Sequence, residues 1–281
     1  MSNLSITPSD RTDALLDIFG ISKPIIGTIH LLPLPGSPRY AGEAVESIYS
    51  RAVEDARRYA EGGVDGLIIE NDGDIPFLKP EDIGPETVAC MAVATSEVIK
   101  AVGLPTGVLV LANAALQSIA VAKSAGANFV RVNQWVNAYI ANEGFLEGIA
   151  GRALRYRAQL KAENIRIFAD VHVKHGSHAI VADRTLADLT YDTEAFDADV
   201  VIATGERTGD PTRVEEITAI SSVAKRPVLV GSGLNADNAK ELLQFSHGAI
   251  VGSAMKEDGA WWNPVSVANT RKIMDVVKKI R

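Results

Sequence analysis

Short apolar runs alternate with longer amphipathic stretches from Pro24 to the end of the chain. The apolar runs are rich in Val and Ile, as is typical of parallel strands covered on both faces. They predict strands at about Ile25–Ile29, Gly66–Ile69, Thr106–Leu111, Phe129–Val132, Arg166–Val171, Val200–Ala203, Pro227–Val230 and Ala249–Gly252. The intervening stretches have helical periodicity and predict helices at about 43–62, 85–102, 114–125, 143–162, 183–197, 212–224, 235–245 and 264–280.

Glycine and asparagine mark the expected helix ends, at Gly62-Gly63, Gly103, Gly126 and Asn164. Eight strand–helix pairs favour a closed α/β barrel, the (β/α)8 or TIM-barrel fold, over an open doubly wound sheet. We expect this barrel to span residues 24–281.

Residues 1–23 are expected to form an extension with one short helix. Ser9 or Asp10 is suited to cap it, and Gly20 to end it after Phe19. This helix would either cover the bottom of the barrel or pack on a partner subunit.

The composition is that of an ordinary globular chain, with 281 residues, 47% of them hydrophobic and 22% charged. A net charge of −7 argues against binding to nucleic acid or to an anionic membrane surface. Cys90 is the only cysteine, which excludes an intrachain disulfide and a cysteine metal cluster. We find no apolar run of about 18 residues and no secretory signal, so we expect a cytoplasmic protein without a membrane span. An even-numbered homo-oligomer is expected from base rates alone.

Two glycine-rich strand ends near the C-terminus form the clearest motif. The run Val228–Val230 is followed by Gly231, Ser232 and Gly233, and the run Ala249–Val251 by Gly252 and Ser253. Backbone N–H groups at two such ends can hold one phosphate between them, as the loops after strands seven and eight do in many barrels. The alternative is a pair of ordinary strand–helix turns.

The fifth predicted strand carries Asp170, His172 and Lys174, followed by His175. With a period of two, the first three side chains share one face, and they belong to the classes that move protons beside a carbonyl. Lys174 is also suited to form a Schiff base. A divalent metal held by Asp170, His172, Glu70 and His30 is a further option. In the alternative reading, these residues only satisfy structural hydrogen bonds.

Other polar residues follow the remaining strands. Glu70 is a candidate general base or a structural partner of Arg131, and His30 is a candidate catalytic residue or a cap on the loop that contains Pro33, Pro35 and Pro38. The residues expected to contact the substrate are Asn71, Asn113, Arg131, Asn133, His175, Thr204 and Glu206. The helical face with Arg51, Glu54, Asp55, Arg57, Arg58 and Glu61 is expected to be a solvated surface.

Three segments together resemble one family. They are Pro24–Pro38, Glu70-Asn71-Asp72 and Asp170–His175. Together with the glycine-rich segment Val230–Leu234, they are similar to the BtpA/SgcQ family. The resemblance extends from about Lys23 to the end of the chain. The resemblance implies a TIM barrel related to ribulose-phosphate-binding barrels. One branch of the family is named for the accumulation of photosystem I in cyanobacteria, and another is assigned to sugar metabolism from its operon setting.

These observations lead to an enzyme hypothesis, in which an isomerase, epimerase or aldolase-like lyase acts on a phosphorylated small metabolite. Asp170, His172 and Lys174 would move protons, assisted by Glu70 or His30. No cofactor is required by the sequence, although a divalent metal ion fits the same residues. The rival hypothesis is an assembly or stability factor, with the barrel used as a scaffold or metabolite sensor.

Overall fold

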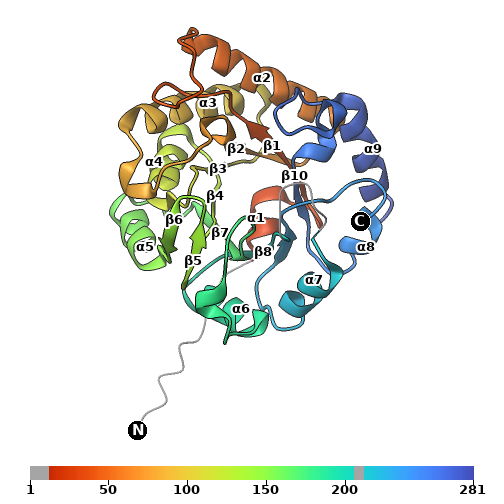
Figure 1. Ribbon diagram of the computed structural model, residues 1–281. Coiled ribbons are helices and arrows are strands. Elements are labelled where there is room, and N and C mark those ends of the chain that lie inside the picture. Colours follow the sequence, from red (N-terminus) through yellow and green to blue (C-terminus); the bar gives the residue numbers. More distant parts are fainter. Residues whose placement is uncertain (1–12, 206–211) are drawn as a thin grey trace.

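Eight parallel strands close into a barrel in the computed structural model, which describes residues 13–205 and 212–281 (Figure 1). Around the barrel the strand order is β1-β10-β9-β8-β7-β4-β3-β2. The bounds are β1 Ile25–His30, β2 Gly66–Glu70, β3 Thr106–Leu109, β4 Phe129–Val132, β7 Arg166–His172, β8 Val200–Ala203, β9 Val228–Val230 and β10 Ala249–Val251. The (β/α)8 prediction is therefore confirmed, and every predicted strand end lies within two residues of the observed one.

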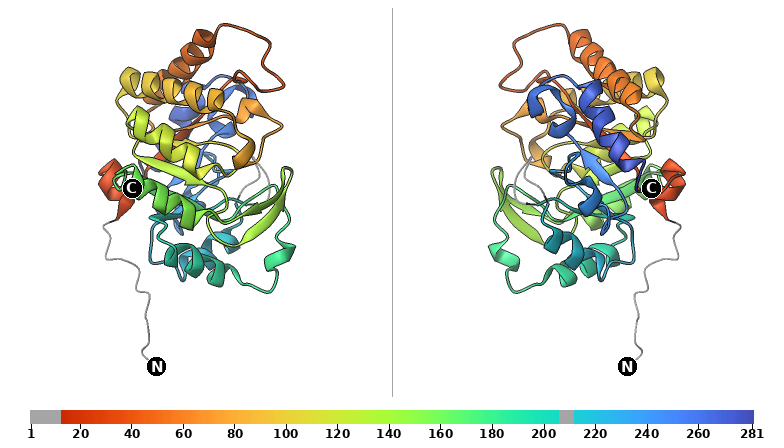
Figure 2. Two further views of the ribbon diagram at one scale, coloured as in Figure 1. Left: turned by 90° about the vertical axis from the view of Figure 1, so that its left-hand side faces the viewer. Right: turned by 90° about the vertical axis from the view of Figure 1, so that its right-hand side faces the viewer.

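Helices surround the barrel on all sides, as Figures 1 and 2 show. Their bounds are α2 Val45–Gly62, α3 Pro85–Val102, α4 Ala115–Ala125, α5 Ala150–Gln159, α6 Leu186–Ala195, α7 Val214–Ser221, α8 Ala239–Leu242 and α9 Val267–Val277. The short 3-10 helices are η1 Asp72–Asp74, η2 Pro80–Asp82, η3 Ala179–Val181, η4 Ser253–Met255 and η5 Glu257–Gly259. Among the described residues, none of these helices has the length and apolar character needed to cross a bilayer.

Three of the four predicted helix ends are confirmed. Gly63, Gly103 and Gly126 follow α2, α3 and α4 with φ values of 88°, 65° and 84°, a left-handed conformation that strongly favours glycine. Asn164 does not end its helix, because α5 stops at Gln159 and Leu160 is its C-cap.

The N-terminal helix α1, Ala14–Phe19, closes one end of the barrel. Leu15 is buried with side chains from the barrel interior, and Phe19 meets the ring of Phe129 edge-on at 6.1 Å. Asp13 caps the helix by accepting from the backbone N–H of Leu15 at 2.9 Å. The predicted caps, Ser9 and Asp10, lie outside the described residues. The helix thus covers the bottom of the barrel, one of the two expected arrangements.

A two-stranded antiparallel sheet, absent from the predictions, lies at the opposite end of the barrel from α1 (Figure 2). It consists of β5, Ala138–Ala141, and β6, Gly144–Glu147, so the predicted helix at 143–162 was wrong in its first part. Tyr139 and Leu146 are paired and buried, whereas their neighbours Ile140 and Phe145 are exposed. This period of two marks a hairpin, and Gly144 turns the chain with a φ of 98°.

Candidate functional site

A polar cavity opens at the carboxyl ends of the barrel strands, away from α1. It has two adjoining lobes of about 220 and 280 Å³. Four residues line both lobes: His30, Glu70, Arg131 and Lys174. Because β1, β2, β4 and the segment after β7 supply these side chains, the closed barrel brings together residues that are up to 144 positions apart (174 − 30).

The first lobe, here called the glycine lobe, is lined by Gly231, Ser232, Gly233, Gly252 and Ser253. A side chain at position 231 would place its Cβ 2.5 Å from Ile202 Cγ2, so only glycine fits there. The two strand ends expected to cradle a phosphate therefore do line one cavity. The helix predicted after Gly233 is shorter than expected, since α8 spans only Ala239–Leu242.

Lys174 places a cation beside the glycine lobe. Its Nζ lies 3.5 Å from Ser232 Oγ, and its backbone N–H donates to Thr204 Oγ1 at 3.0 Å. Burial, followed by the charge of Arg131, lowers the pKa of Lys174 to about 8. The ammonium form therefore dominates at neutral pH, and a neutral amine becomes accessible slightly above it.

The second lobe, here called the apolar lobe, extends under the β5–β6 hairpin. Its apolar walls come from Phe77, Leu109, Leu111, Tyr139 and Trp261. A ligand that spans both lobes would place a polar group against glycines and Lys174, and a less polar part against these side chains. Trp261, which precedes the last helix of the chain, thus borders the cavity.

Arg131 and Asp170 form a closed ion pair at the back of the cavity. Arg131 Nε donates to Asp170 Oδ1 at 3.0 Å and Arg131 Nη2 donates to Oδ2 at 3.1 Å, while Asn133 Nδ2 donates to the same Oδ2 at 3.2 Å. Arg131 Nη1 also lies 3.5 Å from Glu70 Oε1. Both oxygens of Asp170 are engaged and its side chain is fully buried. Asp170 would have to leave Arg131 before it could bind a metal or carry a proton.

His172 lines neither lobe of the cavity, whereas Lys174 lines both. The pairing of β7 with β8 shifts register between Asp170 and His172, which breaks the period of two on which the prediction relied. The His172 ring stacks on His178 with 3.7 Å between centroids, and both line a neighbouring cavity. The expectation of one shared face for Asp170, His172 and Lys174 was therefore wrong, and so was a metal set that joins His172 to His30.

A compact group of titratable side chains lies where the two lobes meet: His30, Glu70 and Asp72. One ligand atom from each lies within 4.8 Å of the others. His30 and Glu70 end neighbouring parallel strands and are partners in the register. Asp72 begins η1, the turn that carries the chain back over the barrel rim. Asp72 was not assigned a role from the sequence, although its spacing of two from Glu70 at a strand end was an available signal.

Burial shifts the pKa values in this group. It raises the pKa of Glu70 to about 7, with the charge of Asp72 as the next cause, and it also raises the pKa of Asp72. Burial, followed by the charge of Lys256, lowers the pKa of His30 to about 4. A carboxyl group that titrates near neutral pH is suited to general acid–base catalysis.

Several residues expected to contact a substrate hold the backbone instead. Asn71 Oδ1 accepts from the N–H of Leu111 at 2.7 Å, and Asn113 Oδ1 accepts from the N–H of Gln134 at 2.8 Å. Thr204 Oγ1 donates to the His172 carbonyl at 3.0 Å. Asn133 and His175 border the apolar lobe. Glu206 lies outside the described residues, so its role stays a prediction.

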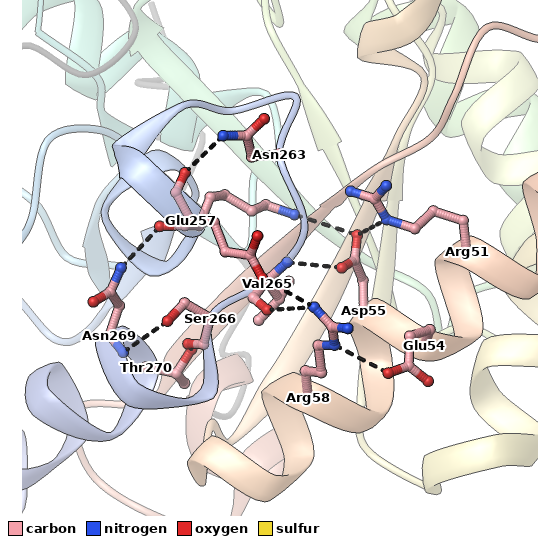
Figure 3. Close-up of polar contacts among 11 residues, drawn as sticks. Arg51, Glu54, Asp55, Arg58, Glu257, Asn263, Val265, Ser266, Asn269 and Thr270 are labelled. Carbon is pink, nitrogen blue, oxygen red and sulfur yellow. Dashed lines mark hydrogen bonds and ion pairs between the residues drawn. The ribbon is translucent and has the colours of Figure 1, made fainter.

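The segment after β10 is fixed to α2 through Asp55 (Figure 3). Asp55 accepts from the N–H of Val265 at 2.8 Å and from Arg51 Nε at 3.1 Å, and it lies 3.7 Å from Lys256 Nζ. Asp55 is 1% exposed, so its assignment to a solvated helical face was wrong. The same segment brings the Trp261 carbonyl to His30 Nδ1 at 2.9 Å. Asp55 therefore anchors the segment that orients the imidazole of His30.

Together these features define a (β/α)8 barrel with a polar cavity at the carboxyl ends of its strands. The BtpA family model matches residues 21–279, and the chain belongs to the BtpA family. An uncharacterized protein of Pyrococcus abyssi is 41% identical over 260 residues, which cover 92% of this chain and 98% of the relative. The photosystem I biogenesis protein BtpA of Synechocystis is 38% identical over 246 residues, covering 87% and 84%. The resemblance seen in the sequence is confirmed.

A solved structure supports the fold independently. The (S)-3-O-geranylgeranylglyceryl phosphate synthase of Thermoplasma acidophilum, in complex with its substrate sn-glycerol-1-phosphate, matches with a TM-score of 0.58. The match covers 94% of this chain and 97% of the synthase at 17% identity, a level at which the likeness concerns the fold.

Proposed function

We propose that the protein is an enzyme that binds a small phosphorylated metabolite and transfers a proton at a carbon next to a carbonyl. The observation that carries this proposal is the continuity of the glycine lobe with His30, Glu70 and Lys174 in one cavity. In this arrangement the phosphate occupies the glycine lobe, where backbone N–H groups and the Lys174 ammonium balance its charge. A solved synthase with the same fold binds a phosphorylated substrate, which supports a phosphorylated ligand by analogy.

Glu70 is the proposed general base, and its neighbours set its properties. Its pKa of about 7 allows it both to take and to return a proton near neutral pH. His30, kept neutral by burial, is the proposed hydrogen-bonding partner of the substrate. Asp170 is proposed to hold Arg131 in place, rather than to move protons, because both its oxygens are already bound.

A second candidate reaction is an aldolase-like cleavage through a Schiff base on Lys174. The observation that favours it is the buried amine with a pKa lowered to about 8, since only a neutral amine attacks a carbonyl. Borohydride added with the substrate would trap a covalent adduct on Lys174 in this case. The absence of an adduct, together with turnover, would assign the reaction to proton transfer.

Ligand binding is tested by thermal unfolding of the purified protein against phosphorylated sugars, other phosphorylated metabolites and their unphosphorylated counterparts. A ligand at 100 times its Kd adds about 2.7 kcal/mol to the unfolding free energy, which raises the melting temperature clearly. Ser232→Asp places a carboxylate in the glycine lobe and should abolish the rise. Ser47→Asp, in the exposed first turn of α2, adds the same charge elsewhere and should preserve it.

No response to any phosphorylated compound, with both variants folded, would contradict the proposal. It would favour the assembly-factor hypothesis, in line with the name of the Synechocystis relative. A partner that co-purifies without turnover would support that alternative.

A further inference from the structure

The chemistry of His30, Glu70 and Asp72 extends beyond proton transfer. Their candidate ligand atoms, one imidazole nitrogen and two carboxylate oxygens, lie within 4.8 Å of one another. His30 Nε2 and Asp72 Oδ2 are 3.6 Å apart. Two atoms that each bind one ion at about 2.1 Å lie roughly 3.0 to 4.2 Å apart, so this spacing suits a shared metal ion.

The imidazole of His30 is held in the orientation that a metal ligand needs. Its side chain is 8% exposed, and its Nδ1 lies 2.9 Å from the Trp261 carbonyl, which can only accept a hydrogen bond. Nδ1 therefore donates, and in the neutral ring the lone pair is on Nε2. Nε2 points at Asp72, but 3.6 Å is longer than a hydrogen bond. A proton or a metal cation between this lone pair and the carboxylate would stabilise both groups.

The cations that the structure describes balance these carboxylates only in part. The Asp72 side chain is 24% exposed, yet its Oδ2 is inaccessible to solvent and accepts no hydrogen bond from the residues that the structure describes. Arg131, the cation nearest to Glu70, is held by two bonds to Asp170. Lys256 Nζ lies against Asp55 at 3.7 Å, and Lys174 Nζ is directed toward Ser232. Two neighbouring carboxylates, Glu70 buried and Asp72 partly exposed, would be stabilised by a cation bound between them.

We propose that His30, Glu70 and Asp72 bind a divalent transition-metal ion at the junction of the two lobes. One nitrogen and two carboxylate oxygens suit Mn²⁺, Fe²⁺, Co²⁺ or Zn²⁺ better than Ca²⁺ or Mg²⁺, which prefer oxygen ligands alone. His30 and Glu70 line both lobes, so the remaining coordination positions would face the bound metabolite. This inference deepens the proposed function: with an ion bound, His30 would act on the substrate through that ion, which would polarise a carbonyl whose phosphate lies in the glycine lobe.

The trio differs from the metal set expected from the sequence, in which Asp170 and His172 joined His30 and Glu70. Variants of residues that belong to only one of the two sets can therefore be compared. Asp72→Asn and His30→Gln each remove one proposed ligand at nearly constant volume. His172→Ala removes a histidine of the same barrel rim that lies in the neighbouring cavity.

The test is a titration of chelator-treated protein with Mn²⁺. Electron paramagnetic resonance measures the concentration of free Mn²⁺ at each step. The wild type should bind one equivalent, and Zn²⁺ should displace the Mn²⁺ in competition. Asp72→Asn and His30→Gln should each weaken Mn²⁺ binding by at least about tenfold, whereas His172→Ala should bind like the wild type. Circular dichroism of each variant checks the fold, and either of the two ligand variants suffices if the other fails to fold.

Two results would overturn the metal site: no binding of Mn²⁺ or Zn²⁺ to the wild type, or equal affinity in the wild type and a folded ligand variant. The first would mean that a proton on Glu70 takes the place of the cation. Neither result bears on phosphate binding, which is measured without metal through Ser232→Asp. The failure of the metal site and the failure of the proposed function are therefore distinguishable.

Discussion

Asp170 on one side, and Glu70 with Asp72 on the other, lie near each other at the carboxyl ends of the barrel strands. The two sets of carboxylates differ in their partners. Asp170 receives two bonds from Arg131 and one from Asn133, so its charge is balanced. Glu70 and Asp72 lie close to each other and to His30, and among the described residues Glu70 makes one long contact to Arg131. Burial alone does not identify a functional carboxylate. A shortage of partners does identify such a carboxylate. A buried charge without a partner lowers stability, so its presence points to a function.

The largest effect on the free energy of unfolding is expected from breaking the ion pair between Arg131 and Asp170. Asp170→Asn removes the charge that balances Arg131 while preserving the shape of the side chain. We expect a loss of about 3–5 kcal/mol in the free energy of unfolding, because a buried guanidinium is left without its main partner. Urea unfolding at pH 7 measures this change. A loss below about 1 kcal/mol would show that the pair is not structural, and would return Asp170 to the list of proton carriers.

Removing the charge of Glu70 should have the opposite effect and should stabilise the folded protein. The pKa of Glu70 is about 7 in the folded protein, above the ordinary value of 4.5. Below pH 4.5 the group is protonated in both states and costs nothing, whereas above pH 7 it is ionised in both and its full cost applies. Glu70→Gln should therefore become more stable than the wild type as pH rises from 4.5 to 7, by up to about 3 kcal/mol.

Urea unfolding of the two proteins at pH 5 and pH 8, with chelator present, measures this difference. Every other titrating group is common to both proteins, so the difference reports the charge of Glu70 together with its interactions with Asp72 and His30. A stability difference that stays constant, or that grows toward acid, would show that Glu70 is adequately partnered in the folded state.

The smallest effect is expected at another buried carboxylate, Asp55. Its partner Arg51 is 27% exposed and lies one helical turn away, and the Val265 N–H and Lys256 remain when Arg51 is lost. Arg51→Ala should therefore cost less than about 1 kcal/mol, as exposed ion pairs usually do. Urea unfolding at pH 7 tests this value. A loss of unfolding free energy as large as that of Asp170→Asn would show that Arg51 is as important for stability as Arg131. The buried and the partly exposed ion pairs would then not differ in their contribution.

The fold could be predicted from the sequence because it repeats one local signal. Each apolar run is followed by an amphipathic stretch, and eight repeats leave little choice of architecture. The glycine lobe was predictable for the same reason, since Gly231 and Gly252 follow directly from the ends of their strands. Local patterns were sufficient wherever the structure is locally regular.

The site was predicted less well because its geometry depends on irregular backbone. A register shift breaks the period of two between Asp170 and His172, and no residue type in the sequence predicts that shift. Asp55 has the helical spacing of a surface residue, but it is buried by a segment that lies 210 positions later in the chain. Asp72 reaches the cavity only because η1 folds back over the rim. Contacts between distant segments decide these three positions.

The central claim is that one cavity holds both a phosphate and a divalent ion. Phosphorus-31 relaxation of a bound phosphorylated ligand, measured with one equivalent of Mn²⁺, tests it directly, because the paramagnetic effect falls steeply with distance. The account predicts strong relaxation enhancement in the wild type, and its loss in Asp72→Asn although the ligand still binds. Enhancement that is absent in the wild type, or unchanged in Asp72→Asn, would contradict the account and separate the phosphate from any metal site.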